Sequence, residues 1–191
     1  MDTAHLETAM VEPGPLKISK LDAGRRQLRT AITLWFNGSD PVATHALAFA
    51  SYEVLHAVSK KRDPNRMPLI FDSSFIKEEF RSEINIALKK NAYFFKHGDR
   101  EPEAIIEFNP AMTDGFILFA IAALQLCGES IGTEESAFLL WTRIREPRWS
   151  GGDDKELMET ILPVDHVHQL KRIPKHDFLH MYKLAQAQRR R

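Results

Sequence analysis

Hydrophobic residues recur every three or four positions along much of the chain, with polar residues between them, which is the period of amphipathic helices. The pattern predicts five longer helices, over about residues 18–36, 41–62, 74–97, 110–127 and 133–146. Shorter helices are expected near residues 154–162 and 175–189. No segment shows the two-residue alternation of a strand, so we predict an all-α fold.

Polar residues and glycine punctuate the predicted helices. Ser39 or Asp40 can cap the second helix, because a side-chain oxygen just before the first turn accepts a free backbone N–H. Asp72 or Ser73 can cap the third helix in the same way, and Gly98 is expected to close it. The helix ends are therefore defined by local chemistry as well as by the hydrophobic period.

The predicted helices suggest a bundle-like core with a helical C-terminal extension. Residues 1–16 end in the sequence Glu-Pro-Gly-Pro and are expected to form a loose arm. Residues 17–128 hold four long helices and form the predicted core, of which 41–62 is apolar almost all round and is expected to be central. Residues 129–191 form the extension.

Composition narrows the classes of protein to which the chain can belong. Its 26 basic and 26 acidic residues cancel, which excludes the overall basic character of a dedicated nucleic-acid binder but not a local basic patch. One cysteine forms no internal disulfide, and the N-terminus lacks the segments of a secretory signal, so we expect a cytoplasmic protein. The most apolar run, residues 115–128, is shorter than the roughly 20 residues that span a bilayer, and no membrane association is predicted.

The end of the third predicted helix is the strongest candidate for a site. Its apolar stripe comprises Phe80, Ile84, Ala87, Leu88, Phe94 and Phe95. Asn91 falls within this stripe, where an amide needs a hydrogen-bond partner. Lys90 and His97 are seven residues apart and point in nearly the same direction at the edge of the stripe, so they can face one partner or ligand together. The alternative is structural, with a hydrogen-bonded Asn91, a solvated Lys90 and a His97 that stabilises the helix end.

The spacing of Lys90, Asn91 and His97 resembles the signature of the HEPN superfamily, α-helical proteins with an Arg, often followed by Asn, and a His a few residues further on. The resemblance implies a four-helix core and, in active members, metal-independent cleavage of RNA by the Arg and His of two protomers. Here Lys90 stands in place of the Arg; it keeps the charge but lacks the planar fork that binds a phosphate at two points. The segments 38–58 and 91–110 also resemble a set of uncharacterised bacterial proteins.

Two function classes follow. The first is an interaction or regulatory module, expected to be a homodimer, because one helix can bury only one stripe while aromatic residues crowd on or beside this one: Phe71, Phe75, Tyr93, Phe94 and Phe95. The second is an HEPN-like ribonuclease in which His97 and Lys90 act and Asn91 supports them. Whether the protein is an enzyme stays open at this point.

Basic residues gather at the C-terminus and suggest a second contact surface. The candidates for nucleic-acid binding are Lys171, Arg172, Lys175, Arg189, Arg190 and Arg191. Such a local excess of positive charge attracts phosphate backbones. The alternative is a solvated helix end that binds nothing. If the chain has a partner besides a second copy of itself, we expect RNA or another protein.

Metal sites have weaker support. Glu53 and His56 have the spacing of a di-iron ligand pair, but no second copy of the motif occurs. His176 and His180 are one helical turn apart and could both bind zinc, although no third ligand is evident. We predict neither a metal nor a cofactor, and the C-terminal histidines stay an open alternative.

Overall fold

A computed structural model describes residues 14–145 and 169–189, and this part of the chain contains helices and no strand. The all-α prediction is therefore confirmed. The principal elements are α1 (Lys20–Phe36), α2 (Pro41–Arg62), the 3₁₀ turn η1 (Ile70–Asp72), α3 (Glu78–Lys96), α4 (Met112–Leu126), α5 (Thr133–Arg145) and α8 (Lys175–Arg189). No helix in the described part is long and apolar enough to cross a membrane.

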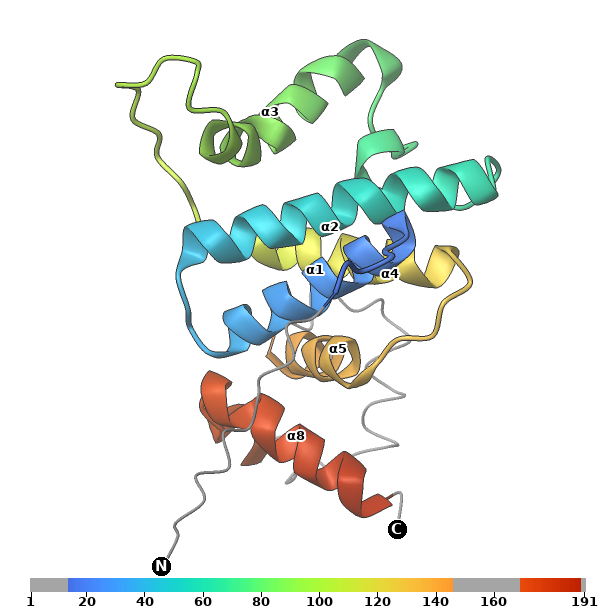
Figure 1. Cartoon of the computed structure of the whole chain (residues 1–191), viewed down its shortest axis with the longest axis vertical. Helices are drawn as coiled ribbons and strands as arrows, with labels where there is room; N and C mark the ends of the chain where they lie inside the picture. The colour runs from blue at the N-terminus through green and yellow to red at the C-terminus, as the bar shows by residue number, and fades with distance from the viewer. Residues whose placement is uncertain (1–13, 146–168, 190–191) are drawn as a thin grey trace, which may run out of the picture.

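The helices lie in layers around α2. Figure 1 shows α3 on one side of α2, α1 and α4 on its other side, and then α5 and α8 at the far end of the molecule. α2 buries residues on several sides, including Phe49, Tyr52 and Leu55, as expected for the central helix. α3 differs from α2 because it is the outermost helix on its side of the molecule, with other helices on one side of it alone among the described residues.

α1 and α2 make a close contact at Gly24. This glycine is buried within α1, and its carbonyl oxygen accepts a hydrogen bond of 2.9 Å from Ser51 Oγ on α2. A Cβ atom at Gly24 would lie 2.9 Å from Leu55 Cγ. The absence of a side chain at this position therefore lets the two backbones approach closely.

Aromatic side chains join the C-terminal helices to the same core. Trp35 and Phe36 at the end of α1 contact Phe138 on α5. Phe36 also stacks on Phe178 of α8, with ring centroids 6.0 Å apart, and Trp141 meets Phe178 edge to face. Residues from α5 and α8 thus contribute to the main hydrophobic core, which extends beyond the four helices that the sequence predicted.

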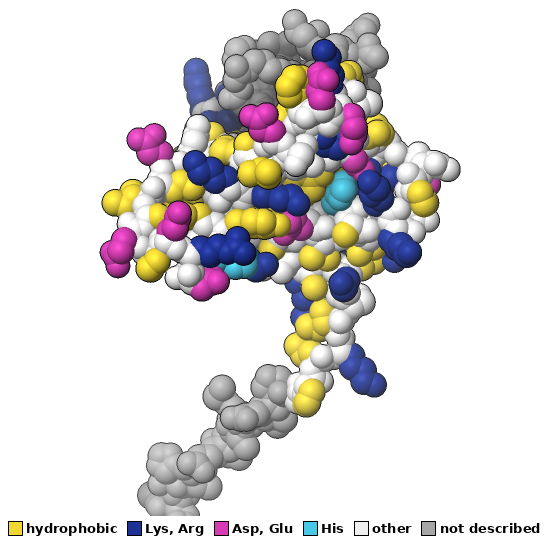
Figure 2. All heavy atoms as spheres, turned by 90° about the horizontal axis from the view of Figure 1, so that it is seen from above, with side chains coloured by type: hydrophobic (Ala, Val, Ile, Leu, Met, Phe, Trp, Pro, Cys, Tyr) yellow, Lys and Arg dark blue, Asp and Glu magenta, His cyan; other side chains and the backbone are white. Residues whose placement is uncertain are grey.

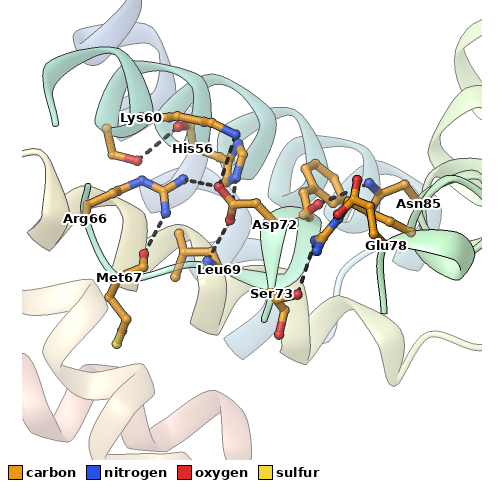
Figure 3. A network of polar contacts seen from close by, with 12 residues as sticks. His56, Lys60, Arg66, Met67, Leu69, Asp72, Ser73, Glu78 and Asn85 are labelled. Carbon is orange, nitrogen blue, oxygen red and sulfur yellow. Dashed lines mark hydrogen bonds and ion pairs between the residues drawn. The ribbon is translucent and has the colours of Figure 1, made fainter. Parts of the chain in front are cut away.

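The segment before α3 is held to α2 by the carboxylate of Asp72 (Figure 3). One oxygen accepts the Leu69 N–H at 2.8 Å and lies 3.2 Å from His56 Nε2; the other lies 3.5 Å from Lys60 Nζ and 3.2 Å from Arg66 Nη2. Burial raises the pKa of Asp72, but the Leu69 N–H and His56 outweigh this effect and keep the pKa below its ordinary value. The network fixes where the chain leaves α2 to reach α3.

The predicted helix ends are correct at α2 and wrong at α3. Asp40 caps α2, because its Oδ1 accepts the Ala43 N–H at 2.8 Å. Asp72 instead accepts the Leu69 N–H and caps η1, so α3 begins only at Glu78 without a side-chain cap. At its other end the C-cap is His97, not the residue after it.

A candidate interaction site on α3

α3 rests on α2 through a narrow strip of its surface. Only Asn91 and Ala92 are buried, while Ile84, Leu88 and Phe95 are half-buried beside them. Three hydrogen bonds from side chains to backbone carbonyls secure the first half of the helix: Arg81 donates to Ser73 and Ile76, and Asn85 donates to Phe71. Most of the remaining surface of α3 is left without a neighbour among the described residues.

The uncovered face of α3 is unusually apolar. The exposed fractions are 69% for Ile86, 49% for Phe80, 41% for Tyr93 and 38% for Phe94. Phe80 and Phe94 were predicted to lie in the buried stripe, and that part of the prediction is wrong: the stripe that contacts α2 is narrower than the sequence pattern suggested. Figure 2 shows the molecule from this side, where hydrophobic side chains are interspersed with Lys, Arg, Asp and Glu.

Lys90 and His97 lie on this uncovered side. Lys90 is exposed, and His97 is half-buried at the C-cap with its ring edge to face with Tyr93, 5.8 Å between centroids. Ile86, Lys90, Tyr93 and His97 follow one another at intervals of four, three and four residues, so they form one stripe along the helix. We call these four residues the outer stripe.

Asn91 does not belong to the outer stripe. It is buried, as predicted, and its Nδ2 contacts the thioether of Met112 at the start of α4, 3.4 Å away. A thioether is a weak acceptor, so this contact is weaker than the specific polar contact that the sequence suggested. Asn91 and Lys90, about 100° apart around the helix, therefore face different surroundings, and the three predicted residues do not form one cluster.

Two grooves flank α3. The larger, of about 400 Å³, lies between α3 and α2 and is lined by Leu47, Phe49, Tyr93 and Phe95, with Gln27 and Glu53 among its polar groups. A smaller groove of about 190 Å³ separates α3 from α4 and is almost entirely apolar, with Leu88 and Met112 in its walls. Tyr93 lies at the border between the outer stripe and the larger groove, because its partly exposed ring also meets Phe49 of α2 edge to face, so the apolar surface of α3 continues into that groove.

The predicted basic surface at the C-terminus is not a single patch in the described residues. Lys171 and Arg172 are exposed, but the Lys175 ammonium lies 3.4 Å above the ring of Trp35. Burial lowers the pKa of Lys175, and nearby Asp114 partly offsets this. The side chains of Arg189, Arg190 and Arg191 lie outside the described residues.

Lys175 lines a cavity of about 250 Å³ that the sequence did not reveal. Trp35 and Asp114 form two of its other walls, and the indole Nε1 donates to Asp114 Oδ1 at 2.5 Å. These residues come from three different helices and share no sequence motif, so no local signal could have identified the cavity.

The histidines suggested as metal ligands have other partners. His56 faces Asp72 and not Glu53, which lines the large groove. His176 is exposed beside Asp177, at 3.3 Å, and His180 is exposed as well. Among the residues that the structure describes, no group of three or more His, Cys, Asp or Glu side chains is placed to hold a metal ion.

A fully buried histidine, His45, lies in the core beneath α3. Its Nδ1 is 3.1 Å from Thr113 Oγ1, and its ring is surrounded by Phe49, Phe95, Phe108 and Phe116. Burial lowers the pKa of His45 to about 4, so the ring is neutral at physiological pH. His45 therefore belongs to the packing of the core.

The sequence matches no protein-family model and has no significant match among curated proteins or solved structures. The arrangement of side chains on α3 is consequently the basis for the functional argument.

Proposed function

We propose that this chain is a helical interaction module whose binding surface is the uncovered face of α3. The observation that supports the proposal is the exposure of Ile86, Phe80, Tyr93 and Phe94 on one helix. Exposed apolar residues gathered in one patch and surrounded by polar residues are typical of protein interaction sites. Tyr and Phe are also enriched in such interfaces, where their rings bury a large area.

The anchoring of α3 supports the same function. Arg81 and Asn85 bind α3 to the segment just before it, and the Asp72 network binds that segment to α2. A partner helix can therefore pack along the other side without α3 having to fold on binding, which lowers the entropy cost of association. The cytoplasmic location stays a prediction from cysteine usage.

The HEPN-like ribonuclease is the second candidate, favoured by the position of Lys90 and His97 on the same outer stripe. There, His97 would transfer a proton and Lys90 would offset charge that develops on the phosphate. The reaction would then stop in His97→Ala and increase in Lys90→Arg, with EDTA present throughout. Intact single-stranded RNA after incubation with purified wild-type protein would rule this candidate out.

Site-specific photo-crosslinking tests the interaction module. A benzophenone amino acid is placed at Ile86 or Tyr93 in the cells that produce the protein, and at exposed Thr30 on α1 as a matched control. We expect covalent protein adducts from the two α3 positions and none above background from Thr30. If the α3 positions give no more adduct than the control, the face binds no protein and the proposal is wrong.

A further inference from the structure

We infer that the partner of α3 is the α3 of a second copy of this chain, packed antiparallel along the outer stripe. This inference rests on the proposed interaction function and adds the identity of the partner and its direction. It comes from the order of charges along the helix and from the residues between them.

The surface of α3 that continues the outer stripe changes sign along its length. Glu79 and Glu83 precede Ile86 at the same alternating spacing and are exposed, whereas Lys90 and His97 follow it. Glu79 lies 4.0 Å from Lys77, at the exposed start of the helix, and no partner of Glu83 or Lys90 is found among the described residues. One end of the stripe thus carries two carboxylates and the other carries Lys90 and His97, with Ile86 between Glu83 and Lys90.

A two-fold axis near the middle of the stripe makes this pattern complementary to itself. In a symmetric dimer, if residue i meets residue j, then j of the first copy also meets i of the second. Glu83 and Lys90 are about 10 Å apart along the helix, at 1.5 Å per residue, and their midpoint falls beside Ile86. An antiparallel pair therefore sets Glu83 of each copy beside Lys90 of the other, twice in the same interface.

The parallel arrangement lacks this complementarity. It would place Glu83 against Glu83 and Lys90 against Lys90, and like charges that face each other across a contact are unfavourable. In the antiparallel arrangement Ile86 of each copy lies near the axis, between the two ion pairs, and Tyr93 lies outside them. Phe80 and Phe94 extend the apolar contact along one side.

Charge reversal on purified protein tests both the partner and the direction. Glu83→Lys and Lys90→Glu are made singly and together; both positions are exposed, so neither change disturbs the core. Lys61→Glu, at the exposed end of α2, is the matched control for the charge change. Sedimentation and light scattering over a range of micromolar concentrations give the dissociation constant of each variant.

The wild type is expected to be a dimer. Each single reversal should raise its dissociation constant by about tenfold or more, because two ion pairs become two repulsions. The double reversal should restore the wild-type dissociation constant. Lys61→Glu should match the wild type. A monomeric wild type, or a dimer that neither reversal weakens, would overturn the inference. Photo-crosslinks from Ile86 to a different protein would then leave the interaction module standing, whereas their absence would remove both.

Discussion

Gly24→Ala should destabilise the protein, although alanine is the better helix former. In an open helix the exchange stabilises by about 1 kcal/mol. In α1 the new Cβ would lie 2.9 Å from Leu55 Cγ, 3.0 Å from Leu55 Cδ2 and 3.3 Å from Val54 Cγ1, so α1 and α2 must separate. Overpacking of this kind costs about 1 to 3 kcal/mol. The separation also lengthens the bond from Ser51, which contributes about 1 kcal/mol. We therefore expect a net loss of about 1 to 3 kcal/mol.

Urea unfolding followed by far-ultraviolet circular dichroism measures this loss, and Leu55→Ala supplies the control. Leu55 is fully buried, and its truncation alone should cost about 2 to 5 kcal/mol. It also removes the two nearest atoms that the new Cβ would meet and leaves Val54 Cγ1 at 3.3 Å, so Gly24→Ala should be neutral or stabilising in the Leu55→Ala background. A higher unfolding midpoint for Gly24→Ala in the wild-type background would refute the close contact between the two helices.

Two further predictions concern titrating groups. Burial lowers the pKa of His45 from 6.5 to about 4, so as the pH falls the imidazole is protonated in the unfolded chain before it is protonated in the folded one. The folded state therefore loses stability as the pH falls from 6.5 toward 4. The loss should reach roughly 2 kcal/mol at pH 5, measured by urea unfolding, and His45→Phe should have a shallower pH dependence. Asp72→Asn should lower the free energy of unfolding by about 1 to 3 kcal/mol. It should also lower the pKa of His56 further, because the Asp72 carboxylate raises that pKa against the effect of burial. NMR titration of His56 measures the second effect. An unchanged His56 titration would mean that the two side chains do not interact in solution.

Helix ends were predictable where local chemistry determined them. Asp40 and Pro41 define the start of α2 within one turn, and the structure agrees. The sequence also contains a capping box at the start of α1, where Ser19 accepts the Asp22 N–H, and this local signal sets the first residue of α1 at Lys20. Asp72 was misassigned because its partners include His56 and Lys60 from α2, which no local pattern reveals.

The sequence could indicate that the candidate site lies on α3, but not which residues of α3 are exposed together. Helical spacing predicts Lys90 and His97 on one side of α3; in the structure Lys90 is exposed and His97 is half-buried at the end of the helix. It could not show that Asn91 faces α4, or that Phe94 stays exposed, because a helix with apolar residues on two sides does not indicate which side its own fold covers. Lys175 could not be assigned either, since its contact with Trp35 depends on how α8 docks.

The docking of α8 on the aromatic cluster also affects the synthesis of the protein. Phe178 covers Phe36 and Trp141, yet its helix, α8, is synthesised after every other described helix. The 44 residues that follow Arg145, up to Arg189 at the end of α8, take about 2 to 9 seconds to translate at typical rates of 5 to 20 residues per second. During that interval Phe36 and Trp141 lack their contacts with Phe178, so the aromatic cluster of the nascent chain is incomplete until α8 has been made.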